Sequence, residues 1–351
     1  MPTSYLVCPG VNISRFVHSL GVMHLASKIM TQLIASVDKD KYNELFPAID
    51  DKRIVSVVRA AGLLHDIGHG PFSHSSEQTM RKALIELHAD EMDEAKKITL
   101  EEDEKKLPVH EYFSYKLMTE SGELKEILDE NLGARNVATL ITKTKNTNTE
   151  VAKNHDGLSI LRKIVSSQLD ADRMDYIIRD AAWAGVSYGS IDPDRVIGNM
   201  AIRKVKDNYE LAIHERALNA VESIVDSRFK MYKWVYHHHM VVATEELSQR
   251  LLAWLYDTIT SIKKQFHWKA FQEGELSDVE IEATLKEQLN TDNNDVLNFK
   301  GFKDRRFLPV SILKRREDHA KLHQDIRQAI APPNSCYNAE VATARTTKKI
   351  L

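Results

Sequence analysis

Apolar residues recur at helical spacing along much of this chain. Between residues 15 and 34 they form two stripes, and His18 lies on the second of them. A helix that is apolar on two sides is normally buried. The pattern returns at steps of four, three and four in a stripe made of Ile54, Val58, Ala61 and His65. The sequence therefore predicts two buried helices, each with a histidine on an apolar face.

Further helices are predicted after these two. Long helices are expected over residues 161–182 and 215–259, and shorter ones with acidic linkers over 261–298. Residues 84–106 are rich in Glu, Asp and Lys, which indicates a solvated helical excursion that ends before a new helix near His110.

The pattern as a whole predicts an all-α protein. A helical core is expected over residues 1–260, followed by a mostly helical, partly basic extension over 261–351 with a loose tail. Residues 143–156 are polar and are expected to form a surface loop. The low content of breakers agrees, because 13 Gly and 9 Pro in 351 residues fall below the usual shares of roughly 7% and 5%.

Composition excludes several classes of protein. The two cysteines, Cys8 and Cys336, are too few for a disulfide framework or a cysteine-rich zinc module. No apolar run approaches the roughly 18 residues of a membrane span, and no signal peptide is evident at the start. The formal net charge of −3 gives no general attraction to nucleic acid. We expect a soluble intracellular protein, cytoplasmic or nuclear, without a membrane partner.

Ionisable residues stand on the buried faces of three predicted helices. His18 lies on the first, the pair His65-Asp66 ends the second, and Asp172 continues a stripe of the third. One histidine on an apolar face is usually a core residue with a satisfied hydrogen bond. The recurrence on three helices favours a metal site instead, because buried charges are costly unless they are paired or bound to metal. Imidazole and carboxylate ligands suit Mn, Fe, Zn, Ni or Mg.

Several longer strings resemble one enzyme family. They are YLVCPGVNISRFVHSLGV at 5–22, AGLLHDIGHGPFSH at 61–74, His110-Glu111, DADRMDYIIRD at 170–180 and RFKMYKWVY at 228–236. Together they resemble the deoxynucleoside triphosphate (dNTP) triphosphohydrolases of the HD-domain superfamily, which include the sterile-alpha-motif HD proteins and their bacterial relatives. The resemblance covers residues 5–240 and implies an HD-type helical core that binds a divalent metal. It also implies hydrolysis of dNTP at the α-phosphorus to a deoxynucleoside and triphosphate.

The same resemblance assigns roles to individual residues. The implied metal ligands are His18, His65, Asp66 and Asp172. The implied catalytic residues are His69 and His110, with Glu77 as an acidic partner. The implied substrate-binding residues are Arg15, His74, Arg173, Tyr176, Asp180, Arg228, Tyr232 and Tyr236. Arg173 departs from relatives, which carry Lys at this position.

Simpler structural roles stay open for some of these positions. His69 and His74 fit a polar loop after a helix, His110 fits a helix start after Pro108, and the tyrosines fit ordinary core packing. Residues 237–239 are three consecutive histidines and are expected to form a partly exposed helical turn. They are not expected to form a second metal site, because consecutive helical residues point about 100° apart.

The resemblance also bears on partners. Family members commonly form tetramers, and some need a nucleotide effector, so a homo-oligomer (dimer or tetramer) and a GTP or dNTP effector are implied. Relatives have a stretch before the equivalent of Tyr5 that contacts the sugar and an effector. The chain therefore looks short at its N-terminus and is expected to lack these contacts.

Two alternative functions remain. The HD core alone allows hydrolysis of a nucleotide monophosphate, a cyclic dinucleotide or a guanosine polyphosphate. A regulatory or nucleic-acid-binding protein is the other alternative, supported by the basic run from Lys303 to Arg316, which also fits a solvated face or a subunit contact. The four ligand positions and the triphosphate-binding set favour the dNTP triphosphohydrolase.

Overall fold

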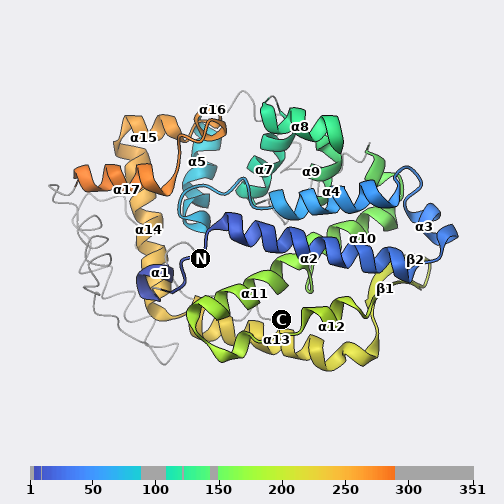
Figure 1. Ribbon diagram of the computed structural model, residues 1–351. Coiled ribbons are helices and arrows are strands. Elements are labelled where there is room, and N and C mark those ends of the chain that lie inside the picture. The colour runs from blue at the N-terminus through green and yellow to red at the C-terminus, as the bar shows by residue number, and fades with distance from the viewer. Residues whose placement is uncertain (1–3, 9, 88–107, 121, 143–148, 289–351) are drawn as a thin grey trace.

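Two long helices lie side by side across the middle of the protein, α2 (Arg15–Ser36) and α4 (Asp51–Leu64) (Figure 1). The structure is a computed structural model that describes residues 4–8, 10–87, 108–120, 122–142 and 149–288. Both central helices start at a side-chain cap, because Ser14 accepts a hydrogen bond from the Val17 amide and Asp50 accepts from the Arg53 amide. The two predicted helices are confirmed, but only the later part of α2 is buried, because Phe16, Val17 and Leu20 near its start are exposed.

Other helices cover both sides of this central pair. The remaining helices of the first two hundred residues are α1 (Ser4–Val7), α3 (Lys39–Leu45), α5 (Glu77–Leu87), α7 (Val109–Thr119), α8 (Glu123–Asn131), α9 (Ala134–Ile141), α10 (His155–Val165), α11 (Ala171–Ala184) and α12 (Pro193–Ile197). The later ones are α13 (Leu218–Met231), α14 (His239–Thr258), α15 (Thr260–Gln265), α16 (Trp268–Gln272) and α17 (Asp278–Glu287). Short 3-10 turns are η1 (Ser73–Ser76), η2 (Glu150–Ala152), η3 (Ser187–Gly189) and η4 (Glu215–Ala217), and η5 (Tyr232–Tyr236) is a π-helical turn.

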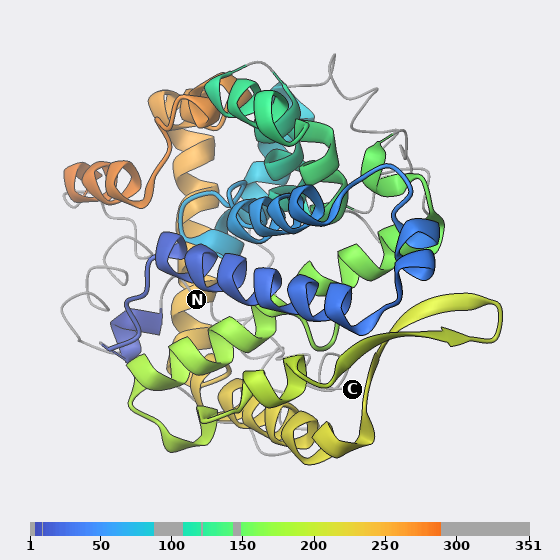
Figure 2. The same cartoon turned by 45° about the vertical axis from the view of Figure 1, so that its right-hand side comes forward.

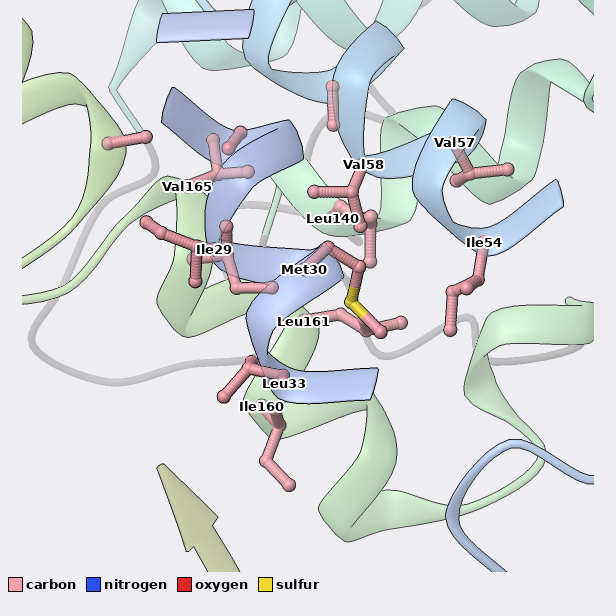
Figure 3. Packing of buried hydrophobic residues seen from close by; sticks show 14 of the residues in the cluster. Ile29, Met30, Leu33, Ile54, Val57, Val58, Leu140, Ile160, Leu161 and Val165 are labelled. Carbon is pink, nitrogen blue, oxygen red and sulfur yellow. The ribbon is translucent and has the colours of Figure 1, made fainter. Parts of the chain in front are cut away.

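The main core lies between the central helices and their neighbours. Figure 3 shows Ile29, Met30 and Leu33 of α2 close to side chains of α4, α9 and α10. Leu161 of α10 and Val58 of α4 are fully buried in the same cluster. Each such side chain contributes about 1.5–3 kcal/mol by leaving water. This core fixes the relative positions of α2, α4 and α10, and α11 also packs on α2.

A second apolar cluster joins distant parts of the sequence. It contains Phe72 and Phe113 together with Leu255 of α14 and Ile281 and Leu285 of α17. Residues from both sides of the predicted boundary near residue 260 therefore share one cluster. The boundary itself stays a prediction.

The fold is mainly helical, as expected, but two predicted long helices are wrong in detail. The helix predicted over 161–182 is interrupted at residues 166–170, where Asp170 caps α11 by accepting a hydrogen bond from the Arg173 amide at 2.7 Å. The helix predicted over 215–259 consists of η4, α13, η5 and α14. The three histidines 237–239 lie where η5 ends and α14 begins, and the His238 side chain caps α14.

One β-hairpin was not predicted. Strands β1 (Met200–Val205) and β2 (Asn208–Ile213) pair antiparallel, with Met200 opposite Ile213, and form the only strands in the described residues. Figure 2 shows this hairpin at the edge of the molecule, beyond the ends of α2 and α10.

Other expectations concern residues that the structure does not describe. Residues 88–106 of the helical excursion, 143–148 of the polar loop, the basic run Lys303–Arg316 and the tail lie outside the described residues. The expected new helix near His110 is confirmed as α7, and short helices after residue 261 are confirmed as α15, α16 and α17. Within the described part, none of the helices has the length and apolar character needed to cross a membrane.

Candidate active site

Three predicted metal ligands meet where α2, α4 and α11 come together. Nε2 of His18 lies 3.1 Å from Oδ1 of Asp172, and Nε2 of His65 lies 3.7 Å from the same oxygen. The two imidazole rings stand edge to face with centroids 5.3 Å apart. One potential ligand atom from each side chain lies within 4.8 Å of the others, so a single cation could contact all three.

Asp66, the fourth predicted ligand, borders this group. Its Oδ1 lies 3.4 Å from Nε2 of His65 and 3.5 Å from Nε2 of His69. Its Oδ2 accepts a hydrogen bond from the guanidinium of Arg15. The Asp66 carboxylate therefore links the His18–His65–Asp172 group to the residues that follow α4.

Each of the two histidines uses its Nδ1 in a hydrogen bond and turns its Nε2 toward Asp172. Nδ1–H of His65 donates to the Gly62 carbonyl at 2.9 Å, and its buried Nε2 has no hydrogen-bond partner in the described structure. Nδ1–H of His18 donates to Asp175 at 2.7 Å. Metal-binding histidines usually donate their other ring N–H to a carboxylate or backbone carbonyl, as both do here. The donor set therefore fits a divalent cation.

The charges of the group support the same conclusion. Burial opposes ionisation of Asp172, but the hydrogen bond from His18 and the nearby imidazole of His65 hold the pKa of its carboxyl below the usual range. Burial also opposes the charged form of His18, and the hydrogen bonds with Asp172 and Asp175 outweigh it, raising the pKa of His18 to about 9. The carboxylates are thus ionised at neutral pH, and a cation would compensate their burial.

A second group contains the predicted catalytic residues. His69 and His110 stack with ring centroids 4.0 Å apart and planes 12° apart. Nδ1–H of His110 donates to Oε1 of Glu77, and Nδ1 of His74 lies 3.5 Å from the same oxygen. Ligand atoms of these four side chains also lie within 4.8 Å of one another. His110 stands in the first turn of α7, and its ring is brought to Glu77 of α5.

Within the second group, the surroundings keep His69 neutral and Glu77 ionised. The side chain of His69 is only 2% exposed, and burial lowers its pKa to about 3, so its imidazole is neutral at physiological pH. Burial opposes the charge of Glu77, but hydrogen bonds from His110 and His74 hold the pKa of its carboxyl below the usual range. A carboxylate that accepts from one ring nitrogen of a histidine fixes the orientation of that ring, as in many acid–base sites.

The predicted substrate-binding residues fall into separate places. Arg15 donates to Asp66 and Ser73, next to His69. His74 is 57% exposed and lies at the rim of the second group. Arg173 pairs with Asp170 at 3.0 Å.

The other five predicted substrate-binding residues gather on α11, the end of α13 and η5. They are Tyr176, Asp180, Arg228, Tyr232 and Tyr236. The Tyr236 hydroxyl donates to Asp180 at 2.6 Å, and the Arg228 guanidinium lies over the Tyr232 ring at 5.3 Å. The buried Tyr176 hydroxyl makes no hydrogen bond within the described residues. It is therefore available to a ligand.

Sequence reasoning missed Asp175. This buried carboxylate lies one turn after Asp172 on α11 and holds both Nδ1 of His18 and the guanidinium of Arg179. The spacing of Asp175 and Arg179, four residues apart on a helix, indicates an ion pair. The contact with His18, 157 positions away, has no sequence signal.

Two family profiles match the chain. The HD domain matches residues 15–179, and the HD associated region matches residues 191–307. The first match spans all four predicted metal ligands and the second histidine group.

The chain is similar to uncharacterized proteins and to proteins named as deoxynucleoside triphosphate triphosphohydrolases. An uncharacterized protein of Bacillus subtilis, YwfO, is 31% identical over 329 residues, 92% of this chain and 63% of YwfO. A protein of Dictyostelium discoideum named as a deoxynucleoside triphosphate triphosphohydrolase SAMHD1 homolog is 28% identical over 239 residues, 67% of this chain and 39% of that protein. The Danio rerio SAMHD1 is 44% identical over 71 residues, 20% of this chain and 10% of that protein. The chain spans 40% to 63% of the length of the first relatives it matches.

Proposed function

Because the chain carries an HD domain and belongs to the HD phosphohydrolase superfamily, we propose that it is a metal-dependent dNTP triphosphohydrolase. The proposed reaction converts dNTP and water into a deoxynucleoside and triphosphate. The observation that carries the proposal is the group formed by His18, His65 and Asp172, in which a buried ring nitrogen of His65 has no protein partner. The partial similarity to proteins named as dNTP triphosphohydrolases supports the substrate class.

The proposed metal site consists of His18, His65, Asp66 and Asp172. A bound divalent cation would polarise a phosphate oxygen and lower the pKa of a water molecule. Two positive charges would also compensate the partly buried carboxylates of Asp66 and Asp172. Mn, Mg, Fe, Zn and Ni are all compatible with this nitrogen and oxygen donor set.

Arg15 is proposed to bind the phosphates. Its guanidinium is held by Asp66 and Ser73, and its side chain is 39% exposed, so it stands beside the proposed metal site and still reaches solvent. A guanidinium binds phosphate through parallel N–H donors. His74 and Arg173 are further candidates for phosphate contacts.

His110 is proposed to donate the proton that the leaving group needs. Attack of water on the α-phosphorus breaks the bond to the 5′-oxygen of the deoxyribose, and that oxygen leaves with negative charge. Glu77 holds Nδ1–H of His110 and so fixes the orientation of the ring, whose Nε2 is proposed to deliver the proton to the 5′-oxygen. Neutral His69 stacks on His110 and lies near Asp66, and it is proposed to orient both.

The tyrosines of α11 and η5 are proposed to bind the sugar and the phosphate chain. Tyr236 is 4% exposed and already bonded to Asp180, which makes a rigid wall suited to exclude a 2′-hydroxyl. The free Tyr176 hydroxyl lies one helical turn after Asp172, so it can reach the phosphates that a cation at Asp172 would hold.

The test is product analysis with each dNTP in the presence of Mn²⁺ or Mg²⁺. We expect deoxynucleoside and triphosphate in equal amounts from the wild type, and none from Asp66→Ala. A matched control is His24→Ala, since His24 is an exposed histidine of the same helix as His18. Release of phosphate or pyrophosphate, or turnover of a cyclic or monophosphate nucleotide alone, would replace this proposal by another HD phosphohydrolase activity.

A leaving-group analogue tests the role of His110. A dNTP with sulfur in place of the 5′-oxygen releases a thiolate, which needs little protonation. His110→Ala should lose turnover of the oxygen substrate by about a hundredfold or more and retain most turnover of the sulfur substrate. Equal losses on both substrates would show that His110 is not the proton donor.

A nucleotide effector and a homo-oligomer are further parts of the proposal. The same product assay with GTP added, and with all four dNTPs mixed, would reveal an effector as a rise in the rate. Light scattering under each condition would show whether a dimer or tetramer forms with it.

A further inference from the structure

The loop after α4 contains two consecutive residues in a left-handed conformation. Phe72 has φ of 52° and Ser73 has φ of 54°, and Lys206 is the only other non-glycine residue with positive φ in the described chain. Such a conformation is unfavourable for a residue with a side chain, because its Cβ crowds the backbone carbonyl oxygen. It therefore persists only where surrounding contacts hold it.

The contacts of these two residues connect them to the candidate active site. Ser73 Oγ accepts a hydrogen bond from Arg15 and lies 3.5 Å from Nδ1 of His69. His74, next in sequence, lies against Glu77 with an Nδ1 to Oε1 distance of 3.5 Å. A change of backbone conformation at Phe72–Ser73 would therefore move contacts of Arg15, His69 and His74 together.

The loop is held from a distant part of the sequence. The Phe72 backbone N–H donates to Oδ1 of Asp278 at 2.7 Å, across 206 positions. Asp278 is the first residue of α17, whose Ser277 caps the helix by accepting from the Val279 amide. Burial raises the pKa of the Asp278 carboxyl, so its position against the loop has a cost that this hydrogen bond offsets only in part.

Helix α17 is itself fixed to the body of the protein. Ile281 and Leu285 are buried in the same apolar cluster as the Phe72 side chain. The Tyr5 hydroxyl donates to Glu282 at 3.3 Å, which also connects α17 to α1. Phe72 is thus bound to α17 through its backbone N–H, by Asp278, and its side chain lies in the apolar cluster that also contains Ile281 and Leu285.

We propose that Asp278 is a positioning residue, by which α17, the last helix of the described residues, holds the Phe72–Ser73 turn and so sets Arg15, His69 and His74 for catalysis. The proposal rests on the proposed function for its catalytic half. The anchoring of the loop by α17 stands on its own observations. Asp278 itself contacts no proposed metal ligand in the interactions described.

The test compares Asp278→Ala, Asp278→Asn and Asp257→Ala. Asparagine keeps a carbonyl oxygen that can accept from the Phe72 amide, whereas alanine does not. Asp257 is a matched control. It is an exposed carboxylate that pairs with Lys82 at 2.5 Å. Hydrogen exchange of the segment 68–76, thermal unfolding, bound metal and steady-state kinetics are measured on the full chain.

We expect faster exchange in segment 68–76 for Asp278→Ala, with the rest of the protein and the metal content unchanged. We also expect a tenfold to about a hundredfold fall in kcat, because small displacements of catalytic groups have effects of this size, and a rise in KM, because Arg15 and His74 are proposed to contact the phosphates. Asp278→Asn should recover most of both losses, and Asp257→Ala should match the wild type.

Three outcomes would overturn the proposal: unchanged exchange in segment 68–76, faster exchange throughout the chain with a falling melting temperature, or a local exchange change with unchanged kcat. If the wild type hydrolyses no nucleotide, the proposed function fails instead. The anchoring of the loop is then decided by the exchange data alone.

Discussion

Replacing Asp175 by Asn tests whether the carboxylate behind His18 tunes metal binding. Asp175 is 5% exposed, accepts from Nδ1 of His18 at 2.7 Å and binds Arg179 at 2.8 and 2.6 Å. Asparagine has nearly the same shape but no charge. Its amide can still accept from His18, but its NH₂ group would face the Arg179 guanidinium, which has only donors.

The expected loss of metal affinity follows from this geometry. Removing an outer carboxylate that orients a histidine ligand typically weakens metal binding 10-fold to 100-fold. That range corresponds to about 1.4–2.7 kcal/mol of binding free energy. Loss of the charge-assisted bonds to Arg179 should also lower the free energy of unfolding, by about 1.5–3 kcal/mol.

The two effects can be separated with a second variant. Arg179→Met removes the ion pair but leaves the hydrogen bond between Asp175 and His18. It should lose stability and keep its metal affinity. Asp194→Asn, which alters an exposed pair with Lys28, is the surface control. The assay is competition with a fluorescent chelator, alongside chemical unfolding; wild-type metal affinity in Asp175→Asn would refute the role of the carboxylate.

Three further results are expected. Gly68→Ala should lower turnover and should lower the free energy of unfolding by about 1–3 kcal/mol, because the new Cβ would lie 2.2 Å from the His110 carbonyl oxygen and from the Ser114 amide nitrogen. Wild-type turnover and wild-type stability in chemical unfolding would show that α7 can move away. Removal of metal by a chelator should lower the melting temperature, and metal at a hundred times its Kd should restore about 2.7 kcal/mol, whereas an identical melting curve would argue against the metal site. Tyr5 should make the free energy of unfolding fall as pH rises from about 10 to 12. Burial and Glu282 raise the pKa of Tyr5 to about 12, above the unfolded value near 10, so the folded state keeps the phenol proton to higher pH than the unfolded state. Urea unfolding at pH 9 and 11 checks this, and Tyr5→Phe should reduce the difference.

Local patterns predicted the elements and residues that depend on neighbouring sequence. The apolar stripes of α2 and α4 were visible because each helix buries its own face. Placing His18, His65 and Asp172 near one another required the resemblance to a family as well as the pattern. The structure brings the three together as expected, with Asp66 at the border of the group.

Features set by tertiary contacts were not visible. The break before α11 depends on Asp170, whose carboxylate accepts hydrogen bonds from the amides of Ser167 and Arg173. An aspartate before an apolar stripe is a helix-start signal, so this break could have been predicted from the sequence. The π-helical turn η5 has no sequence signature, and it changes the spacing of Tyr232 and Tyr236 from that of an α-helix. The contact between Phe72 and Asp278 joins segments that no local pattern relates.

The proposed metal ligands come from three helices that are far apart along the chain. His18 is made early, Asp66 about fifty residues later and Asp172 about a hundred residues after that. During synthesis on the ribosome, an emerging chain would hold at most a partial ligand set until α11 had left the exit tunnel and packed on α2. Metal uptake would therefore report the completion of the HD domain, and chains truncated before residue 172 would be left without it.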